Sequence, residues 1–409
     1  MKDIVLDKLS KYYRNEYQRD NFDSFLSACK FDYKVPSIHI AGTNGKGSTA
    51  IFISNILIDA GYKVGLFTSP YLYRVNEQTK INNISISDEY YLSILNKYEK
   101  QFKKYDLSAF EIEVFVSLNY FMDEKVDIAI IECGMGGEDD ATNIFSPILS
   151  IITSISLEHT EYLGRSIAEI AYNKAGIISP FVPVVISDLE DEAKEVIKSV
   201  SKENKSSLIS TREVIDIRLT DEGYNFTYAP FENLFVPVKS LFILKDAALA
   251  IEAVQLLKQF NINEENIKNG LSNFFNPGRM EIVNQNPLVI VDGAHNPEGI
   301  KELIKSMDKI ENGRHIKIIF ACFKDKNISI MLDSLSVLSS DITLTTFDHY
   351  RARKEEDYFL YLEEYKFNED YKSLILSEVE KSVDDIILIT GSLAFAARAR
   401  KLFEVKKYE

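Results

Sequence analysis

The chain has 409 residues, enough for two domains, and its 45% hydrophobic and 27% charged residues are the balance of a folded globular protein, not a disordered chain. A formal net charge of −15 argues against a surface built mainly for nucleic acid or an anionic membrane, although a local cationic pocket for an anionic substrate is compatible with it. Three widely spaced cysteines, no apolar signal core and no run of about 18 apolar residues favour a reducing, cytoplasmic location without export or a membrane span.

Short apolar strands alternate with amphipathic helices in the first part of the chain, which is typical of a mostly parallel sheet covered by helices. We expect strands at 38–41, 63–67, 128–133, 148–153 and 182–186, and helices at 48–60, 88–105, 109–122, 166–174 and 190–201. Polar and apolar residues alternate over 215–238 on both sides of Asp221-Glu222-Gly223, which predicts a hairpin. Helices at 245–260 and 264–274 are expected to follow.

The pattern restarts near Asn276-Pro277-Gly278, with strands expected at 288–292, 316–321, 342–346 and 386–390. Helical stretches again separate these strands. The sequence therefore predicts an α/β fold in two domains, residues 1–276 and a smaller domain at 283–409.

A glycine-rich segment joins the first predicted strand to a helix: Gly42-Thr43-Asn44-Gly45-Lys46-Gly47-Ser48-Thr49. Glycines let backbone N–H groups converge on phosphate oxygens, and the helix N-terminus adds positive potential. Lys46 can neutralise the β- and γ-phosphates, while Ser48 or Thr49 can support Mg²⁺. Gly47 makes the spacing differ from the common Walker form. The alternative, a turn that binds nothing, is disfavoured because strand, lysine, hydroxyls and helix are all in register.

This spacing resembles the phosphate loop of the Mur ligase superfamily, and further segments are similar to its folylpolyglutamate synthase/dihydrofolate synthase branch. Those segments occur in the family's order: Leu66-Phe67-Thr68-Ser69-Pro70, Glu132-Cys133-Gly134-Met135-Gly136-Gly137, Asp140-Ala141-Thr142-Asn143, Glu158-His159-Thr160, Lys174-Ala175-Gly176-Ile177, Pro277-Gly278-Arg279-Met280-Glu281, Asp292-Gly293-Ala294-His295-Asn296-Pro297 and Gly391-Ser392-Leu393. Singly these motifs are weak, but their joint order is specific. The resemblance implies a P-loop ATPase domain followed by a Rossmann-like glutamate-ligase domain.

Glu132 follows the apolar run 126–131, at the carboxyl end of a predicted strand. Glu132 could hold Mg²⁺ opposite the phosphate loop, since hard cations take oxygen ligands, or it could be a solvated strand-end glutamate. The resemblance implies the metal role and adds Ser69 and His159 as ligands of two Mg²⁺ ions. Taken alone, Ser69 is an ordinary turn serine and His159 a structural histidine.

Lys174 ends a predicted amphipathic helix, where a lysine also favours the helix dipole. In the family the matching lysine is carbamylated, which turns a cation into an anionic Mg²⁺ ligand. Carbamylation needs a neutral amine, so the resemblance implies a site that lowers the lysine pKa by burial or nearby cations. Asn173 stands where the family usually has a glutamate.

The resemblance assigns the remaining roles. ATP-binding candidates are Thr43, Asn44, Gly45, Lys46, Gly47, Ser48, Thr49, Asp246, Arg279 and Asp292, and catalytic candidates are Lys46, His159, Lys174 and Arg279. Substrate-binding candidates are Phe110, Glu111, Asp139, Asp140, Ala141, His295 and Ser392. From composition alone, Phe110 would be core, Arg279 a solvated linker residue and Asp292-Gly293 a strand-end turn.

Some positions depart from the family. Glu138-Asp139 replaces the usual Arg-Leu, and the segment from Phe242 to Ala247 carries Ile243 and Asp246 in place of a motif with a nucleotide-contacting Asn. Asp246 can still accept a hydrogen bond.

The function implied is an ATP-dependent amide ligase that adds L-glutamate to folate or dihydropteroate through an acyl phosphate, as a monomer with small-molecule substrates. A cell-wall peptide ligase acting on a UDP-sugar acid is disfavoured by the short segment before the phosphate loop. A catalytically silent nucleotide-binding regulator is disfavoured by intact Lys46, Glu132, His159 and Lys174, and a P-loop GTPase or motor by Gly47 and the second α/β domain. The choice between folate and dihydropteroate stays open.

Overall fold

The computed structural model describes residues 3–13 and 17–404. The chain forms two compact units: Met1–Asp216 with Phe226–Val236 and Ile243–Phe274, and Ile217–Asn225 with Pro237–Phe242 and Phe275–Glu409. The predicted domain limits, 1–276 and 283–409, stay a prediction. Within the described part of the chain, no helix has the length and apolarity needed to cross a bilayer.

The first unit is built on an eight-stranded sheet of order β4-β3-β2-β5-β1-β6-β7-β8. Its strands are β1 Ser37–Ala41, β2 Val64–Phe67, β3 Thr79–Ile81, β4 Ile84–Ser85, β5 Ile128–Glu132, β6 Leu149–Ile152, β7 Val184–Ile186 and β8 Leu208–Ser210. β3 and β4 form an antiparallel edge, and the other strands run parallel. The parallel strands are buried along their length except β8, which fits their continuous apolar sequences.

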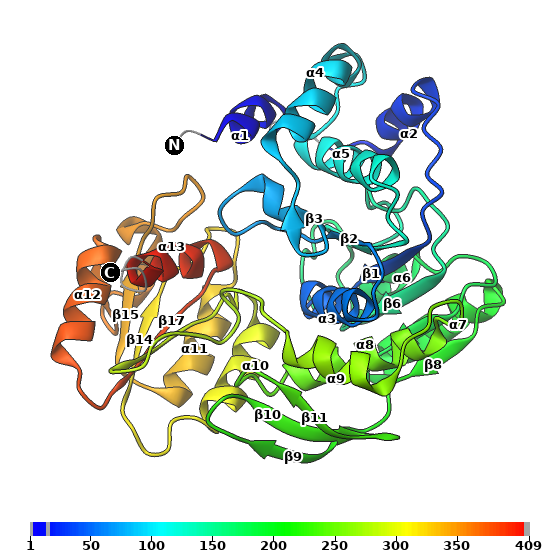
Figure 1. The fold of residues 1–409 in the computed structure, drawn as a ribbon. Helices are drawn as coiled ribbons and strands as arrows, with labels where there is room; N and C mark the ends of the chain where they lie inside the picture. The colour runs from blue at the N-terminus through cyan, green and yellow to red at the C-terminus, as the bar shows by residue number, and fades with distance from the viewer. Residues whose placement is uncertain (1–2, 14–16, 405–409) are drawn as a thin grey trace. The chain divides into compact units, whose positions relative to one another are not determined.

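Helices cover both faces of this sheet (Figure 1). They are α1 Ile4–Leu9, α2 Arg19–Ala28, α3 Lys46–Asp59, α4 Asp88–Lys104, α5 Ala109–Asp123, α6 Ile167–Ala175, α7 Asp191–Glu203, α8 Ile243–Leu256 and α9 Glu264–Ser272, with 3-10 turns η1 Ser10–Tyr12 and η2 Val75–Gln78. α8 and α9 pack on α3, while α2, α4 and α5 share an aromatic core on the opposite face. In that core the Phe115 ring contacts those of Phe25 and Tyr98, with centroids 4.8 and 4.9 Å away.

The segment predicted as one hairpin contains three strands. β9 Ile215–Leu219, β10 Tyr224–Tyr228 and β11 Phe231–Val236 form a sheet of order β11-β10-β9. The turn at Asp221-Glu222-Gly223 is where the alternation placed it. The second turn, at Ala229-Pro230, was missed because the polar and apolar alternation continues across it.

The second unit holds a six-stranded sheet of order β12-β13-β17-β14-β15-β16, parallel except for β12. Its elements are β12 Glu281–Asn284, β13 Leu288–Val291, α10 Pro297–Met307, β14 Ile316–Phe320, α11 Ile328–Leu338, β15 Ile342–Thr345, η3 Glu355–Tyr361, β16 Lys366–Asn368, α12 Tyr371–Lys381, β17 Ile386–Thr390 and α13 Leu393–Glu404. Apolar side chains fill the spaces on both faces of this sheet.

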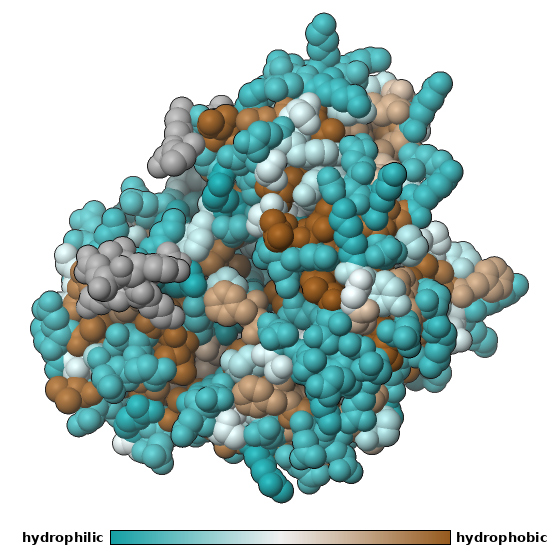
Figure 2. All heavy atoms as spheres, in the orientation of Figure 1, coloured by the Kyte–Doolittle hydropathy of each residue, from teal (hydrophilic) through white to brown (hydrophobic). Residues whose placement is uncertain are grey.

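The face of the molecule in Figure 2 is mostly hydrophilic, with hydrophobic side chains in small groups.

Most predicted strands and helices lie within two residues of the observed ones. The sequence missed the short strands β3, β4, β8, β12 and β16 and the helices α1 and α2. The short strands have two to four residues, and their pairing depends on tertiary contacts that a local pattern does not contain. The first helix predicted after the hairpin, 245–260, ends earlier, at Leu256.

Glu113 on α5 is a buried carboxyl group with a consequence for stability. Its side chain accepts a hydrogen bond from Tyr13 Oη at 3.2 Å, and only 4% of the residue is exposed. Burial raises the pKa of Glu113 to about 7, although hydrogen bonds from Tyr13 and Gln78 oppose this. The folded protein therefore keeps a proton that the unfolded chain releases near pH 4.5, and folding becomes less favourable as the pH rises towards 7.

We expect the variant Glu113→Gln to isolate this effect, because glutamine does not titrate. In urea unfolding, the free energy of wild type relative to the variant should fall by about 3 kcal/mol between pH 4 and pH 8. A difference that stays constant with pH would contradict the raised pKa.

Candidate active site

The glycine-rich loop joins β1 to α3 in the way the sequence predicted. Gly45 caps α3 with φ +87°, a left-handed conformation suited to glycine, and a Cβ there would meet the Asp246 carboxylate. Residues after β6 hold the loop: Thr43 N donates to Ser154 O at 2.8 Å, and Asn44 N donates to Ser154 Oγ at 2.8 Å. These hydrogen bonds tie the loop to the segment that follows β6.

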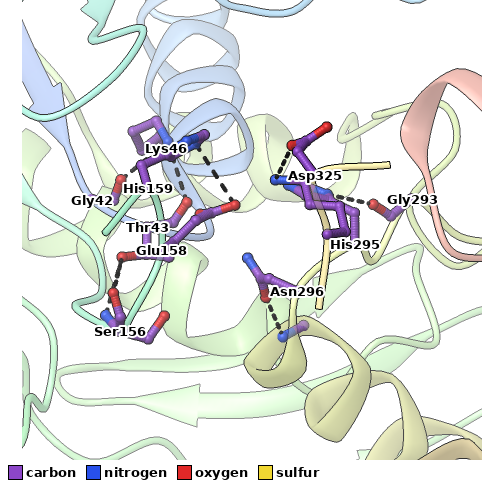
Figure 3. Close-up of polar contacts among 12 residues, drawn as sticks. Gly42, Thr43, Lys46, Ser156, Glu158, His159, Gly293, His295, Asn296 and Asp325 are labelled. Carbon is purple, nitrogen blue, oxygen red and sulfur yellow. Dashed lines mark hydrogen bonds and ion pairs between the residues drawn. The ribbon is translucent and has the colours of Figure 1, made fainter. Parts of the chain in front are cut away.

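Lys46 is the first residue of α3, and its side chain turns back over the loop (Figure 3). Its Nζ donates to Gly42 O at 3.1 Å and to Thr43 O at 3.2 Å. The buried Thr49 Oγ1 has no hydrogen-bond partner among the residues described. An ammonium group, a helix N-terminus and an unsatisfied hydroxyl therefore meet at one place, a combination suited to phosphate.

Glu132 is the last residue of β5 and is 3% exposed. Its Oε2 accepts from Ser69 N at 3.1 Å, and a Cβ added to Gly47 would lie 3.2 Å from the same oxygen. The structure therefore brings together Glu132, Ser69 and the phosphate loop. Oxygen donors beside a phosphate loop fit Mg²⁺.

His159 lies apart from a complete ligand set. It is a non-glycine residue with φ +52°, its side chain is 41% exposed, and its Nε2 is 3.8 Å from Glu158 Oε1 (Figure 3). Across residues 3–13 and 17–404, no three His, Cys, Asp or Glu side chains are grouped as a metal site.

Lys174 lies in the last turn of α6 and is 3% exposed. Its Nζ donates to Gly42 O at 2.9 Å, so it reaches the same carbonyl as Lys46. Burial, and after it the nearby Lys46 charge, together lower the pKa of Lys174 to about 7. At neutral pH a large fraction of this amine is uncharged, which is the condition that carbamylation requires.

The loop after β5 carries the predicted substrate residues. Asp140 is buried, accepting from Met135 N at 2.7 Å and from Thr142 N at 2.9 Å, whereas Asp139 is exposed. Ala141 is buried in the aromatic core. Phe110 packs against Gly134, where a Cβ would clash with its ring, so it contributes to the core as composition suggested.

Glu111 has a structural role. With Ser108 it forms a capping box at the start of α5, and Glu111 Oε2 accepts from Ser108 N at 2.7 Å. Burial raises the pKa of Glu111 to about 7. The Ser-x-x-Glu spacing was a readable sign of this cap.

Arg19 is a residue near this loop that the sequence analysis did not single out. Its guanidinium donates to Asp140 O at 3.3 Å and to Asn143 O at 2.8 Å, and so fixes the turn that carries Asp140. A single arginine near the N-terminus has no spacing pattern that would have revealed this contact.

Asp246 lies on α8, is 1% exposed and abuts Gly45. This position therefore adjoins the phosphate loop even though the side chain differs from the asparagine usual in the family.

In the second unit, the candidate residues lie after adjacent strands. Asp292 follows β13 and accepts from Met280 N at 2.9 Å and Ala294 N at 2.8 Å; burial raises its pKa, and the Arg279 charge opposes this. His295 Nδ1 is 2.9 Å from Gly293 O (Figure 3). Ser392 follows β17 and is 2% exposed, and its Oγ accepts from Ala394 N at 3.2 Å. Carboxyl ends of parallel strands are the usual place for ligands in such sheets.

Comparisons with known proteins agree with this geometry. The Mur ligase middle domain matches residues 40–253, and the Mur ligase glutamate ligase domain matches residues 278–393. The dihydrofolate synthase/folylpolyglutamate synthase of Bacillus subtilis is 34% identical over 388 residues, covering 90% of each chain. The chain belongs to the folylpolyglutamate synthase/dihydrofolate synthase family of Mur ligases.

Solved structures of this family share the fold. Mycobacterium tuberculosis folylpolyglutamate synthase, complexed with ADP and AMPPCP, superposes with a TM-score of 0.90 at 26% identity, covering 98% of this chain and 99% of that one. A folylpolyglutamate synthase complex with AMPPCP and folate gives a TM-score of 0.83 at 28% identity, covering 97% and 98%. The predicted fold class, a P-loop Mur-ligase-type domain with a second α/β domain, is confirmed.

Proposed function

We propose that the protein is an ATP-dependent ligase that joins the amine of L-glutamate to a carboxylate of folate, or of dihydropteroate, releasing ADP and phosphate. The observation that carries this proposal is the convergence of Lys46 and Lys174 on the Gly42 carbonyl, in a phosphate loop bordered by Glu132. The Bacillus subtilis relative is named for both activities, dihydrofolate synthase and folylpolyglutamate synthase.

The reaction requires an activated acyl group, because a free carboxylate is a poor acyl donor. An acceptor carboxylate oxygen attacks the γ-phosphorus, and the bond to the β,γ-bridging oxygen breaks with its electron pair leaving on ADP. The glutamate nitrogen then attacks the acyl carbon, loses a proton, and phosphate departs with the C–O electron pair. Lys46 and the N-terminus of α3 stabilise the charge that builds on phosphate oxygens.

We assign Ser69, Glu132, His159 and Lys174 to two Mg²⁺ ions, with Lys174 as its carbamate. The neutral amine of Lys174 adds to CO₂, a C–N bond forms, and one proton is lost. This exchanges a cation for an anion beside the phosphate loop. Mg²⁺, when bound, supplies charge neutralisation for the triphosphate.

We assign the remaining candidates by the family resemblance. Thr43, Asn44, Gly45, Gly47, Ser48, Thr49, Asp246, Arg279 and Asp292 would bind ATP, with Arg279 also acting on the transferred phosphate; Phe110, Glu111, Asp139, Asp140 and Ala141 would serve the acceptor, and His295 and Ser392 the glutamate. We also propose a cytoplasmic monomer with an ATPase domain at 1–276 and a ligase domain at 283–409, and light scattering in solution tests the oligomeric state.

The substrate experiment uses purified protein with ATP, Mg²⁺, L-glutamate and one acceptor, either tetrahydrofolate or dihydropteroate. We expect mass spectrometry to find an acceptor heavier by one glutamyl residue, together with ADP, only when all components are present. No glutamylated product with either acceptor would contradict the proposed function. A product with a UDP-muramoyl acid instead would point to a cell-wall ligase.

The metal assignment predicts a dependence on Glu132. Glu132→Gln keeps the shape of the side chain and its contact with Ser69 N but removes the charge. We expect the Mg²⁺ concentration for half-maximal rate to rise about 10-fold or more. Glu124→Gln, an exposed acidic position elsewhere on the first unit, serves as the matched control and should leave the Mg²⁺ dependence unchanged. Equal Mg²⁺ curves for wild type and Glu132→Gln would rule out this ligand.

A further inference from the structure

A small polar group lies inside the first unit beneath the substrate loop. It consists of His39 on β1, Cys133 just after β5 and Thr142 in the loop, all with no exposed surface. His39 Nε2 is 2.8 Å from Thr142 Oγ1 and 3.1 Å from Cys133 Sγ. The proposed reaction leaves this group unused, and its imidazole packs on an aromatic ring, Phe145, with centroids 5.1 Å apart.

The group continues to a proposed substrate residue. Thr142 Oγ1 is 2.6 Å from Asp140 Oδ1, and the Asp140 carboxylate also accepts two backbone N–H groups. Burial raises the pKa of Asp140, and the hydrogen bonds from Thr142 and from the Met135 amide oppose this. Because each carboxylate oxygen already accepts a backbone N–H, the single proton of the Thr142 hydroxyl goes to Asp140 Oδ1. The hydroxyl oxygen must then accept from His39, which sets the imidazole tautomer with its proton on Nε2.

The other imidazole nitrogen, Nδ1, agrees with a proton on Nε2. His39 Nδ1 is buried and has no hydrogen-bond partner among the residues described. Burial lowers the pKa of His39 to about 3, so the ring is neutral and its Nδ1 keeps a lone pair. A buried acceptor without a donor costs stability, and an aliphatic residue would pack in this interior without that cost.

We infer that His39 is a positioning residue for the acceptor substrate, because its Nε2–H orients Thr142, and Thr142 orients the Asp140 carboxylate. This rests on the proposed function, in which Asp140 contacts the acceptor. The effect of His39 therefore falls on acceptor binding, while the phosphate loop, held by Thr153 and Ser154 just after β6, binds ATP as before.

The test compares KM for the acceptor with KM for ATP in four variants. His39→Leu and Thr142→Val each break the chain while keeping side-chain bulk. His39→Gln keeps a nitrogen donor at similar reach. Ser150→Ala controls for lost stability. Ser150 lies on β6, in register with His39 on the neighbouring strand β1, and the substitution removes a buried hydrogen bond from its Oγ to Ile177 O.

We expect His39→Leu and Thr142→Val to raise the acceptor KM about 10-fold, with the ATP KM within 2-fold of wild type. The double variant should be no worse than either single one, because both break the same chain. His39→Gln should recover most of the loss, and Ser150→Ala should change only the unfolding midpoint.

Several results would overturn the inference: an unchanged acceptor KM in His39→Leu, an equal rise in both KM values, or no recovery in a folded His39→Gln. Should His39→Leu fail to fold, Thr142→Val and His39→Gln decide the question. Wild type runs in parallel, and its failure to glutamylate either acceptor contradicts the proposed function itself, independently of the variants.

Discussion

Lys46→Met should reduce kcat by about 10²- to 10³-fold, the range seen when one preorganised charge-stabilising group is lost from a catalytic site. Methionine keeps most of the length of the side chain but cannot neutralise phosphate oxygens. Among the described residues, the ammonium group donates hydrogen bonds to the carbonyls of Gly42 and Thr43, both in its own loop, so the fold should survive the change. Rates of ADP release and of glutamylated product, measured with saturating ATP, check the effect.

The control for this prediction is Lys63→Met. Lys63 is also a lysine of the first unit, but its Nζ pairs with Glu124 on the surface, at 2.8 Å. We expect its rate to stay within 2-fold of wild type and the unfolding midpoints of both variants to stay close. A Lys46→Met enzyme with near-wild-type kcat would refute the assignment of this lysine to phosphate.

The phosphate loop shows why local patterns predicted part of the site well. Strand, glycines, lysine and helix follow one another within a dozen residues, and each has a local reason to adopt its observed conformation. The loop could therefore be placed between β1 and α3 from the sequence. What a local pattern lacks is the identity of the loop's neighbours: Ser154 and Asp246 come from distant segments and meet it only in the fold.

The substrate side shows the opposite case. Glu111 and Asp140 could be named from the order of motifs, but the tertiary contacts of Asp140 were not predictable in the same way. The Ser108-x-x-Glu111 spacing indicates a helix cap, and this local sign was available. The contacts of Asp140 with Arg19 and, through Thr142, with His39 join residues more than one hundred positions apart, which no periodicity records.

Lys174 combines both cases. Its place at the end of a helix followed from the amphipathic pattern, whereas its burial and its bond to Gly42 O, from a residue 132 positions away, are tertiary facts. They also decide its chemistry. A lysine on the surface at a helix end would stay protonated at neutral pH, while burial brings the pKa of Lys174 to about 7.

Lys174→Ala should lower kcat by about 10²-fold or more, because the variant lacks both the amine and the carbamate derived from it. Lys174→Arg separates these two roles: arginine keeps a positive charge but cannot form the carbamate, so it should be as inactive as alanine. Added acetate or another small carboxylate should restore part of the alanine variant's rate and none of the arginine variant's, because arginine fills the space.

Carbamylation of Lys174, and with it the rate of the reaction, should increase with pH. At constant dissolved CO₂, the neutral fraction of Lys174 rises as the pH increases through about 7, so carbamylation and the wild-type rate should increase from pH 6 to pH 8. Wild type in CO₂-free buffer should lose activity and regain it when bicarbonate is added, and intact mass in bicarbonate should show a gain of one CO₂. An active preparation that carries only unmodified lysine would refute the carbamate, and full activity of Lys174→Arg would do the same. Lys46→Met provides an internal comparison. In wild type the Lys46 charge disfavours the protonated amine of Lys174, so its loss should raise the pKa of Lys174. Carbamylation of this variant should therefore increase only at a higher pH than in wild type.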